Sequence, residues 1–188
     1  PDPVAIAWRV DNGTIHYHVL KTDVISDPPA LKVHKLTAEK IAEVGEDPHI
    51  ILRQFFESVL SCQTVLAHNM SFCMNVLYAW TRRAADDLNN SEERRKYWAQ
   101  ISNQIPRLRV VCTMQQGATL RGCRQRDALA RLLNIEFDKK LANDSMRHIV
   151  ATQECFWALQ RYKTEQLMIC ELYRRKREGE SERWVGDI

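Results

Sequence analysis

The segment from Val65 to Trp80 constrains the fold of this chain more than any other. Its first three residues are apolar and lead into His68 and Asn69. After this dipeptide, apolar side chains recur at the spacing of one helix face: Phe72, Val76 and Leu77. We therefore expect a short buried strand, a turn held by Asn69, and a helix that runs to about Asp87 with these three side chains in the core.

A β-hairpin is expected at the start of the chain. Val4 to Val10 and Thr14 to Leu20 have strand-like composition, and Asp11-Asn12-Gly13 lies between them. An Asn-Gly pair tolerates the positive φ angles of a two-residue type I′ turn, so we expect that turn here. His16 and His18 then share one face of the second strand. The spacing suits a metal, but two partly exposed strand histidines are the simpler interpretation.

Further elements follow from periodicity and capping signals. Thr37 is a candidate N-cap, and Asp47-Pro48 opens an amphipathic helix whose expected apolar stripe is Ile50, Ile51, Phe55, Val59 and Leu60. The remaining expected elements are a short helix at Pro29–Val33, a helix at Glu92–Ser102 with Tyr97, Trp98 and Ile101 inward, a strand at Leu108–Met114, a helix at Arg124–Leu133 with Leu129, Leu132 and Leu133 inward, and a long helix from Ser145 to Lys163 that continues toward Arg177.

This order of elements predicts an α/β fold with a mixed central sheet flanked by helices. The length of 188 residues fits one domain, which we place at 1–178, followed by a frayed or contact-making tail at 179–188. The net charge of +3 permits a polyanionic partner without requiring one.

Six cysteines lie at wide spacings without a CxxC pair. Reduced, buried thiols are the expected state, which favours an intracellular, reducing compartment such as cytoplasm or nucleus. No apolar run approaches the ~18 residues that a membrane helix needs, so we expect no membrane association.

Several ordered segments resemble the DEDDh 3′–5′ exonucleases, the group of RNase T and the DNA polymerase III epsilon subunit. VLAHNMSFC is similar to the family's "VAHNxxFD" motif, and VVCTM is similar to its strand ending in Thr. VHKLTAEKI resembles the family's "IHGIT-x-E-x-V" segment. Asn143 to Trp157 resembles "HNALxDVxATxxCFxxL", with Ala151-Thr152 and Cys155-Phe156 fixing the register. The resemblance covers most of the chain and implies an RNase H-like fold.

The same register implies a degenerate member of that family. The middle metal-binding Asp falls on Cys73, the general-base His falls on Asn143, and the last metal-binding Asp falls on His148. The family's first motif, a strand with Asp-x-Glu, would precede Val4 and lie upstream of Pro1. The sequence leaves open whether such a strand exists.

These replacements should abolish two-metal hydrolysis. Mg²⁺ and Mn²⁺ require oxygen ligands, which a thiol and an imidazole do not supply. An amide at Asn143 cannot act as a general base near neutral pH. We therefore expect a pseudoenzyme without a metal cofactor. Two alternatives stay open: Asp144 replaces a lost carboxylate, or Cys73 and His148, with His68 and Asp144, hold Zn²⁺.

Basic residues between 121 and 126 make the best candidate nucleic-acid contact, because Arg121, Arg124 and Arg126 are opposed only by Asp127. His68 and Asn69 complete the expected binding set. The leading hypothesis is an inactive exonuclease-like domain that binds single-stranded nucleic acid or a partner protein. One alternative is an active metal-dependent exonuclease with its first motif upstream. The other is a structural or assembly module that uses its helices and basic tail.

Overall fold

The computed structural model describes residues 2–22, 31, 35–135 and 145–184. It begins with an antiparallel hairpin of β1 (Ala5–Trp8) and β2 (His16–Val19), in the register Ala5↔Val19 to Trp8↔His16. His16 and His18 both stack on Trp8, with ring centroids 4.8 and 5.3 Å from it. The expected hairpin and the shared histidine face are therefore confirmed.

The turn of this hairpin differs from the predicted type I′ turn. Strand pairing ends at Trp8 and His16, so the connection is longer than two residues. The positive φ angle, 47°, belongs to Asp11, and a type I′ turn would need positive φ at Asn12 as well. Arg9 donates from Nε to the Asp11 carbonyl, and both Arg9 and Asn12 bond Gln153 of the C-terminal helix. The longer connection between β1 and β2 therefore contacts the C-terminal helix through Gln153.

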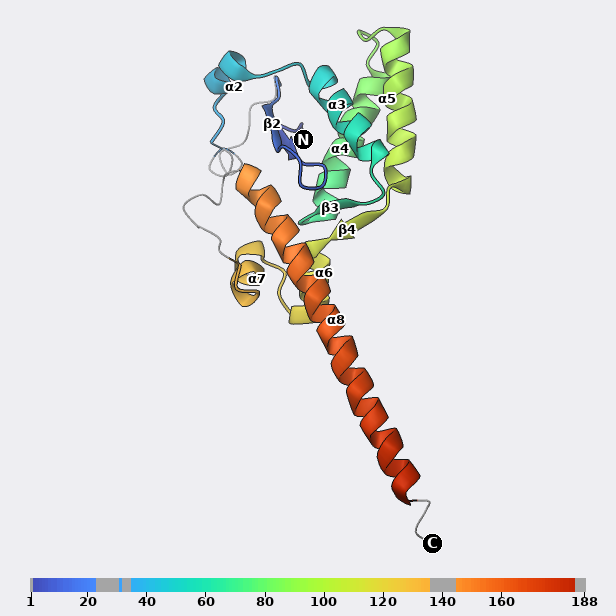
Figure 1. Ribbon diagram of the computed structural model, residues 1–188. Helices are drawn as coiled ribbons and strands as arrows, with labels where there is room; N and C mark the ends of the chain where they lie inside the picture. The colour runs from blue at the N-terminus through green and yellow to red at the C-terminus, as the bar shows by residue number, and fades with distance from the viewer. Residues whose placement is uncertain (1, 23–30, 32–34, 136–144, 185–188) are drawn as a thin grey trace.

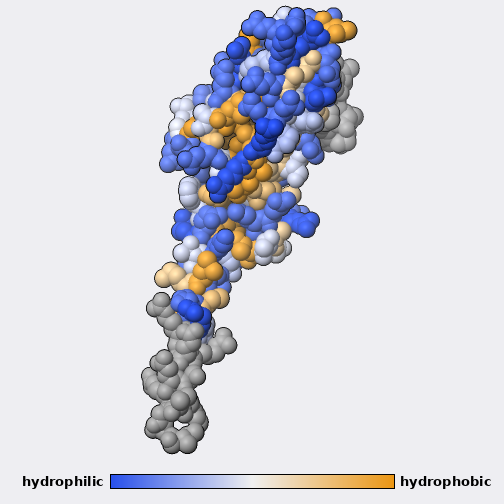
Figure 2. Space-filling view, turned by 90° about the vertical axis from the view of Figure 1, so that its right-hand side faces the viewer, coloured by the Kyte–Doolittle hydropathy of each residue, from blue (hydrophilic) through white to orange (hydrophobic). Residues whose placement is uncertain are grey.

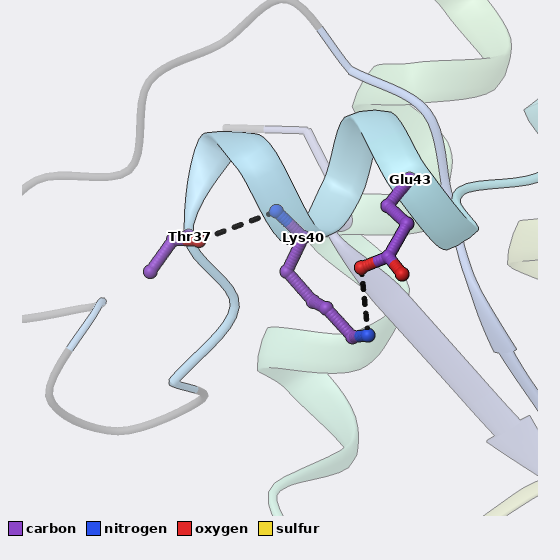
Figure 3. A network of polar contacts seen from close by, with 3 residues as sticks. All are labelled: Thr37, Lys40 and Glu43. Carbon is purple, nitrogen blue, oxygen red and sulfur yellow. Dashed lines mark hydrogen bonds and ion pairs between the residues drawn. The ribbon is translucent and has the colours of Figure 1, made fainter.

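Helix α2 (Ala38–Val44) follows the hairpin and shows the expected cap. The hydroxyl of Thr37 accepts from the Lys40 backbone N–H at 3.2 Å, and Lys40 pairs with Glu43 one turn later (Figure 3). After the helix, Glu46 forms a parallel bridge with Leu20, which ties α2 to the hairpin. The predicted short helix at Pro29–Val33 lies outside the described residues except for Leu31, which is helical.

A large buried cluster forms where α3 (Pro48–Ser61), α4 (Met70–Asp86) and α5 (Glu92–Gln104) meet the hairpin. It is rich in aromatic rings, and Trp98 lies edge-on to both Trp80 and Phe56. These helices lie together on one side of the molecule (Figure 1). We call this set the aromatic core. It contains Trp8, Leu20, Ile51, Leu52, Phe55, Phe56, Val59, Leu77, Trp80, Ala84, Trp98, Ile101 and Ile105.

The helix-face predictions were partly wrong. Ile51, Phe55, Val59, Leu77, Trp98, Ile101 and Leu129 are buried as expected, and Val76, Tyr97 and Leu133 are intermediate. Exposed instead are Ile50, Leu60, Phe72 and Leu132. Leu52 and Phe56 fill the interior positions that the predicted stripe of α3 omitted. The apolar arc of α3 is therefore rotated from the predicted one.

The second sheet is a parallel pair of β3 (Val65–Ala67) and β4 (Val110–Cys112), in the register Val65↔Val110 to Ala67↔Cys112. A short 3₁₀ helix, η1 (Ile105–Arg107), leads from α5 to β4. The predicted strand at Leu108–Met114 is longer than β4, because Thr113 already begins α6 (Thr113–Arg121), a helix that the sequence analysis missed.

A smaller buried cluster joins α6, α7 (Arg126–Leu132) and the first half of α8 (Ser145–Trp184). Its buried members are Leu129, Ala130, Cys155 and Leu159, and we call it the small core. Helix α8 also contacts β1, β2 and β3, so one helix spans both sheets (Figure 1).

Helix α8 continues beyond the rest of the fold. Figure 1 shows its orange first half against the other elements and its red second half projecting away from them. The helix extends to Trp184, so it includes residues 179–184 of the segment that we predicted to be a frayed or contact-making tail, and residues 185–188 lie outside the described residues.

The architecture is mixed α/β, as predicted at that level. The described strands, however, form two two-stranded sheets and not the single mixed sheet that we expected. Within the described residues, no helix is both long enough and apolar enough to cross a membrane.

Candidate functional site

The His68-Asn69 dipeptide lies where β3 passes into α4. His68 Nδ1 is 3.0 Å from the hydroxyl of Thr113, and that hydroxyl also donates to the Ala67 carbonyl at 3.5 Å. Thr113, the first residue after β4, is fully buried. The residue that follows β3, His68, and the residue that follows β4, Thr113, are therefore in polar contact with each other.

Asn69 takes the left-handed conformation, with φ 61° and ψ 53°. Asparagine is among the few non-glycine residues that adopt it readily, which explains its value at this sharp strand-to-helix turn. Its carbonyl accepts the first helical bonds, from Phe72 and Cys73, while its side chain makes no capping bond. The prediction that Asn69 holds the turn is confirmed through its backbone.

Cys73 lies on the first turn of α4, near Cys112 at the end of β4. Burial raises the pKa of the Cys73 thiol, and the neighbouring Cys112 raises that pKa further. The backbone N–H of Met70 donates to Cys112 Sγ at 3.4 Å. A neutral thiol therefore occupies the position where the resemblance expects a metal-binding carboxylate.

His148 lies on the first turns of α8 and pairs with Arg126 at the start of α7. The Arg126 guanidinium is 3.0 Å from His148 Nε2. A guanidinium has only donors, so Nε2 must accept this bond with its lone pair. That lone pair is then engaged and cannot bind a metal ion. The fixed positive charge beside it also opposes a cation and favours an anion.

The other two arginines of the predicted set flank Gly122, which ends α6 in the left-handed region at φ 66°. The Arg121 guanidinium lies over the Tyr162 ring of α8, 4.5 Å from its centroid. Arg124 is exposed in the connection to α7. The three arginines thus surround the short α6–α7 connection, where α8 passes.

Cys73 and His148 do not form a shared ligand group in the described part of the chain. The thiol is near Cys112, whereas the imidazole bonds Arg126. No cluster of three or more His, Cys, Asp or Glu side chains that could hold a metal occurs among the described residues. Asn143 and Asp144, which the sequence analysis named as the general-base position and a metal candidate, lie outside those residues.

Two contacts of this region were missed in the sequence analysis. Tyr162 holds Arg121 by a cation–π contact, and Thr113 bonds His68. Tyr162 continues the spacing of the buried α8 residues Cys155 and Leu159, and that periodicity could have placed it beside the arginines. Thr113 ends the VVCT motif, but nothing in its local pattern pointed to His68.

A separate groove of about 560 Å³ lies between α3 and α5. Trp98 Nε1 donates to His49 Nδ1 at 2.9 Å within it, and Arg53 lies over the Tyr97 ring at 4.9 Å. Its volume is within the range of small-molecule sites. Two arginines and two glutamates line it together, Arg53, Arg94, Glu57 and Glu93, so its walls do not select a ligand charge.

None of the known protein families, curated proteins or solved structures that were compared with this chain matches it.

Proposed function

We propose that this domain is a non-catalytic, exonuclease-like module that binds single-stranded nucleic acid through its phosphates. The observation that carries the proposal is the Arg126–His148 pair. The resemblance to the exonucleases puts a metal-binding carboxylate at residue 148, and an imidazole whose Nε2 accepts from an arginine is there instead. An arginine in this place disfavours a bound metal ion and favours a bound phosphate.

The charge around the pair supports the same function. Arg124 is exposed beside it, and Arg121 is held by Tyr162 on the other side of Gly122. Arginine recognises phosphate oxygens with two parallel donors, and such contacts do not depend on base sequence. We expect binding without strong sequence preference.

An exposed aromatic side chain adds a second kind of contact. Phe72 is 61% exposed on the first turn of α4, next to Cys73. Proteins that bind single strands commonly combine cationic grooves with aromatic rings on which bases stack. In the proposed complex, Phe72 stacks on a base while the arginines hold the backbone.

The test is fluorescence anisotropy of labelled single-stranded DNA and RNA oligonucleotides at several salt concentrations. We expect binding that weakens as salt rises, because phosphate contacts release counterions. The double variant Arg124→Ala/Arg126→Ala should bind several-fold more weakly and reduce the salt slope by about 2, one unit for each contact. The matched control is Arg82→Ala, which removes an exposed arginine of α4.

Two results would overturn the proposal. One is the absence of binding to any oligonucleotide at ~50 mM salt, the range where phosphate contacts are strong. The other is shortening of a 3′-labelled strand in Mg²⁺ or Mn²⁺, which would establish the alternative of an active exonuclease. Loss of binding in the Arg82 variant to the same extent would show that only net charge matters.

A role in assembly is a second candidate, and the projecting half of α8 favours it. Five large apolar side chains are exposed there: Leu167, Met168, Ile169, Leu172 and Tyr173. Such a concentration is unusual on a surface that contacts only water.

A further inference from the structure

The three arginines around the α6–α7 connection are held in three different ways. We call Arg121, Arg124 and Arg126 the arginine site. Arg126 is bonded to His148, and Arg124 is exposed in the connection. Arg121 is half-buried, and its guanidinium lies over the ring of Tyr162, 4.5 Å from the centroid. The three side chains therefore differ in the freedom that they keep and in the donors that they can offer to a ligand.

The backbone of Arg121 is firmly anchored. Arg121 is the last residue of α6, and Gly122 ends that helix in the left-handed region. The N–H of Cys123 then donates to the Gly117 carbonyl at 3.1 Å, which closes the end of the helix. Gly117 lies so close to Leu129 of α7 that a Cβ there would come within 2.8 Å of that side chain. The direction of the Arg121 side chain is therefore the main freedom left at this position.

The ring over which Arg121 lies comes from the last packed turn of α8. Cys155 and Leu159 are buried in the small core, and Tyr162 follows them at the spacing of one helix face. Tyr162 is half-buried, whereas residues 163–170 are all exposed. The ring of Tyr162 therefore lies where α8 leaves the rest of the fold, beside the end of α6.

A guanidinium that lies over a ring keeps its hydrogen-bond donors. The contact with the ring uses the flat face of the guanidinium, whereas the five N–H groups point outward in its plane. Among the described residues, the Arg121 guanidinium has no hydrogen-bond or ion-pair partner. Arg126, in contrast, already engages His148. Arg121 thus combines a held position with donors that are available to a ligand.

Holding an arginine in advance favours the binding of phosphate. A long side chain that is free in solution loses rotamer freedom when it binds a ligand, and this loss weakens the complex. A side chain that a ring already holds loses less. A phosphate also accepts two parallel donors from one guanidinium, so the orientation of the guanidinium plane matters. Both effects favour Arg121 over the exposed Arg124.

We propose that Arg121 is the principal phosphate contact of the arginine site and that Tyr162 is its positioning residue. This inference rests on the proposed nucleic-acid binding and names the side chains that determine its affinity. In the complex, the phosphate lies at the edge of the guanidinium, in its plane, and the Tyr162 ring stays against its face. Tyr162 acts on the nucleic acid through Arg121.

The first test compares variants of Arg121 by fluorescence anisotropy with labelled single-stranded oligonucleotides at several salt concentrations. Arg121→Ala should weaken binding about tenfold and reduce the salt slope by about 1. Arg121→Lys keeps the charge but lacks the planar pair of donors, so the affinity should fall while the slope stays. Arg124→Ala should have a smaller effect than Arg121→Ala. An Arg121→Lys variant that binds as tightly as wild type, or a larger effect of Arg124→Ala, would overturn the proposal.

The second test is a double-mutant cycle on Tyr162. Tyr162→Leu should weaken binding about threefold with an unchanged salt slope, because it removes a ring and no charge. Tyr162→Phe keeps the ring and should bind like wild type. In a chain that carries Arg121→Ala, Tyr162→Leu should have no further effect. The control is Tyr173→Leu, since Tyr173 is 65% exposed on the projecting half of α8, the narrow lower end of the molecule in Figure 2.

The outcomes separate this inference from the proposed function. A wild-type chain that binds no oligonucleotide would overturn the function itself. Binding that Arg124→Ala/Arg126→Ala weakens, but that Arg121→Ala leaves unchanged, would keep the function and overturn this inference alone. If Tyr162→Leu weakened binding equally with and without Arg121, the ring would support the fold and not the arginine, and its positioning role would be wrong. Circular dichroism checks the fold of each variant, and Tyr162→Phe and Arg121→Lys conserve the packing if a larger truncation unfolds α6.

Discussion

The two buried clusters of this protein differ in size and in composition. The aromatic core gathers three tryptophans and two phenylalanines from the hairpin, α3, α4 and α5. Among the described residues, the buried members of the small core are Leu129, Ala130, Cys155 and Leu159, and Arg126 and His148 lie next to each other beside it. Large rings bury the most area per residue, so most of the stability should reside in the aromatic core. The candidate site is thus built on the weaker part of the molecule.

The largest effect should come from the centre of the aromatic core. Trp98→Ala should cost about 4 kcal/mol of unfolding free energy, because it leaves a large cavity and removes the donor to His49. Urea denaturation followed by circular dichroism measures this loss. The control Trp157→Ala removes an exposed ring and should change stability much less. Equal losses in the two variants would contradict the assignment of the core.

A smaller effect is expected in the small core. Leu129→Ala should cost about 3 kcal/mol locally, and hydrogen exchange should increase in α7 and the first half of α8 before it does in α3–α5. Leu132→Ala is the control, since Leu132 is exposed on the same helix. Uniform loss of protection across all helices would show that the two cores unfold as one unit.

The next comparison is the pH dependence of the aromatic core. Burial lowers the pKa of His49, and the Arg94 charge lowers it further, against the opposing charges of Asp47 and Asp87. The unfolded chain therefore binds this proton more tightly than the folded one. Stability should be complete above about pH 6.5 and should decrease as pH falls through the lower folded pKa.

Thermal unfolding between about pH 7.5 and pH 5 tests this sign, because the window brackets the ordinary histidine pKa. His49→Gln should remove part of the decrease, whereas His16→Gln, on the exposed face of β2, should leave it in place. If acidification raised the stability of the wild-type protein, and the His49→Gln variant lacked that rise, the lowered pKa of His49 would be contradicted.

The smallest expected effect is chemical and concerns the small core. Burial raises the pKa of Cys155 to about 11, with the charge of Glu154 adding to the shift. The thiol should therefore react slowly with iodoacetamide near pH 8, whereas the exposed Cys170 should react readily. Mass spectrometry after a timed reaction resolves the two sites. Equal labelling rates in the folded protein would indicate that the small core opens often.

Local signals in the sequence predicted the elements well. The Thr37 cap, the Asp47-Pro48 helix start and the strand-turn-helix around Asn69 depend on nearby residues, and the structure has all three. Packing direction was harder to predict. Phe72 has a helical spacing that suits the core, but it lies on the first turn of α4 and is exposed. Periodicity gives the face of a helix and does not say where the neighbouring elements end.

The candidate site was predictable in part for the same reason. The run of arginines from 121 to 126 was visible in the sequence, but its contacts with Tyr162 and His148 join segments far apart in the chain. The projection of α8 was also not predicted. The apolar residues between 167 and 173 would suit a packed helix, and only the arrangement of the other described elements shows that they are exposed.

The unbroken course of α8 has a geometric consequence. His148 and the last residue of α8, at 184, lie on the same helix, about 54 Å apart at 1.5 Å per residue. At that length, a tilt of the helix by about 5° at the small core would displace its far end by about 5 Å. The helix would then act as a lever that converts a small movement beside the arginine site into a larger one at its end.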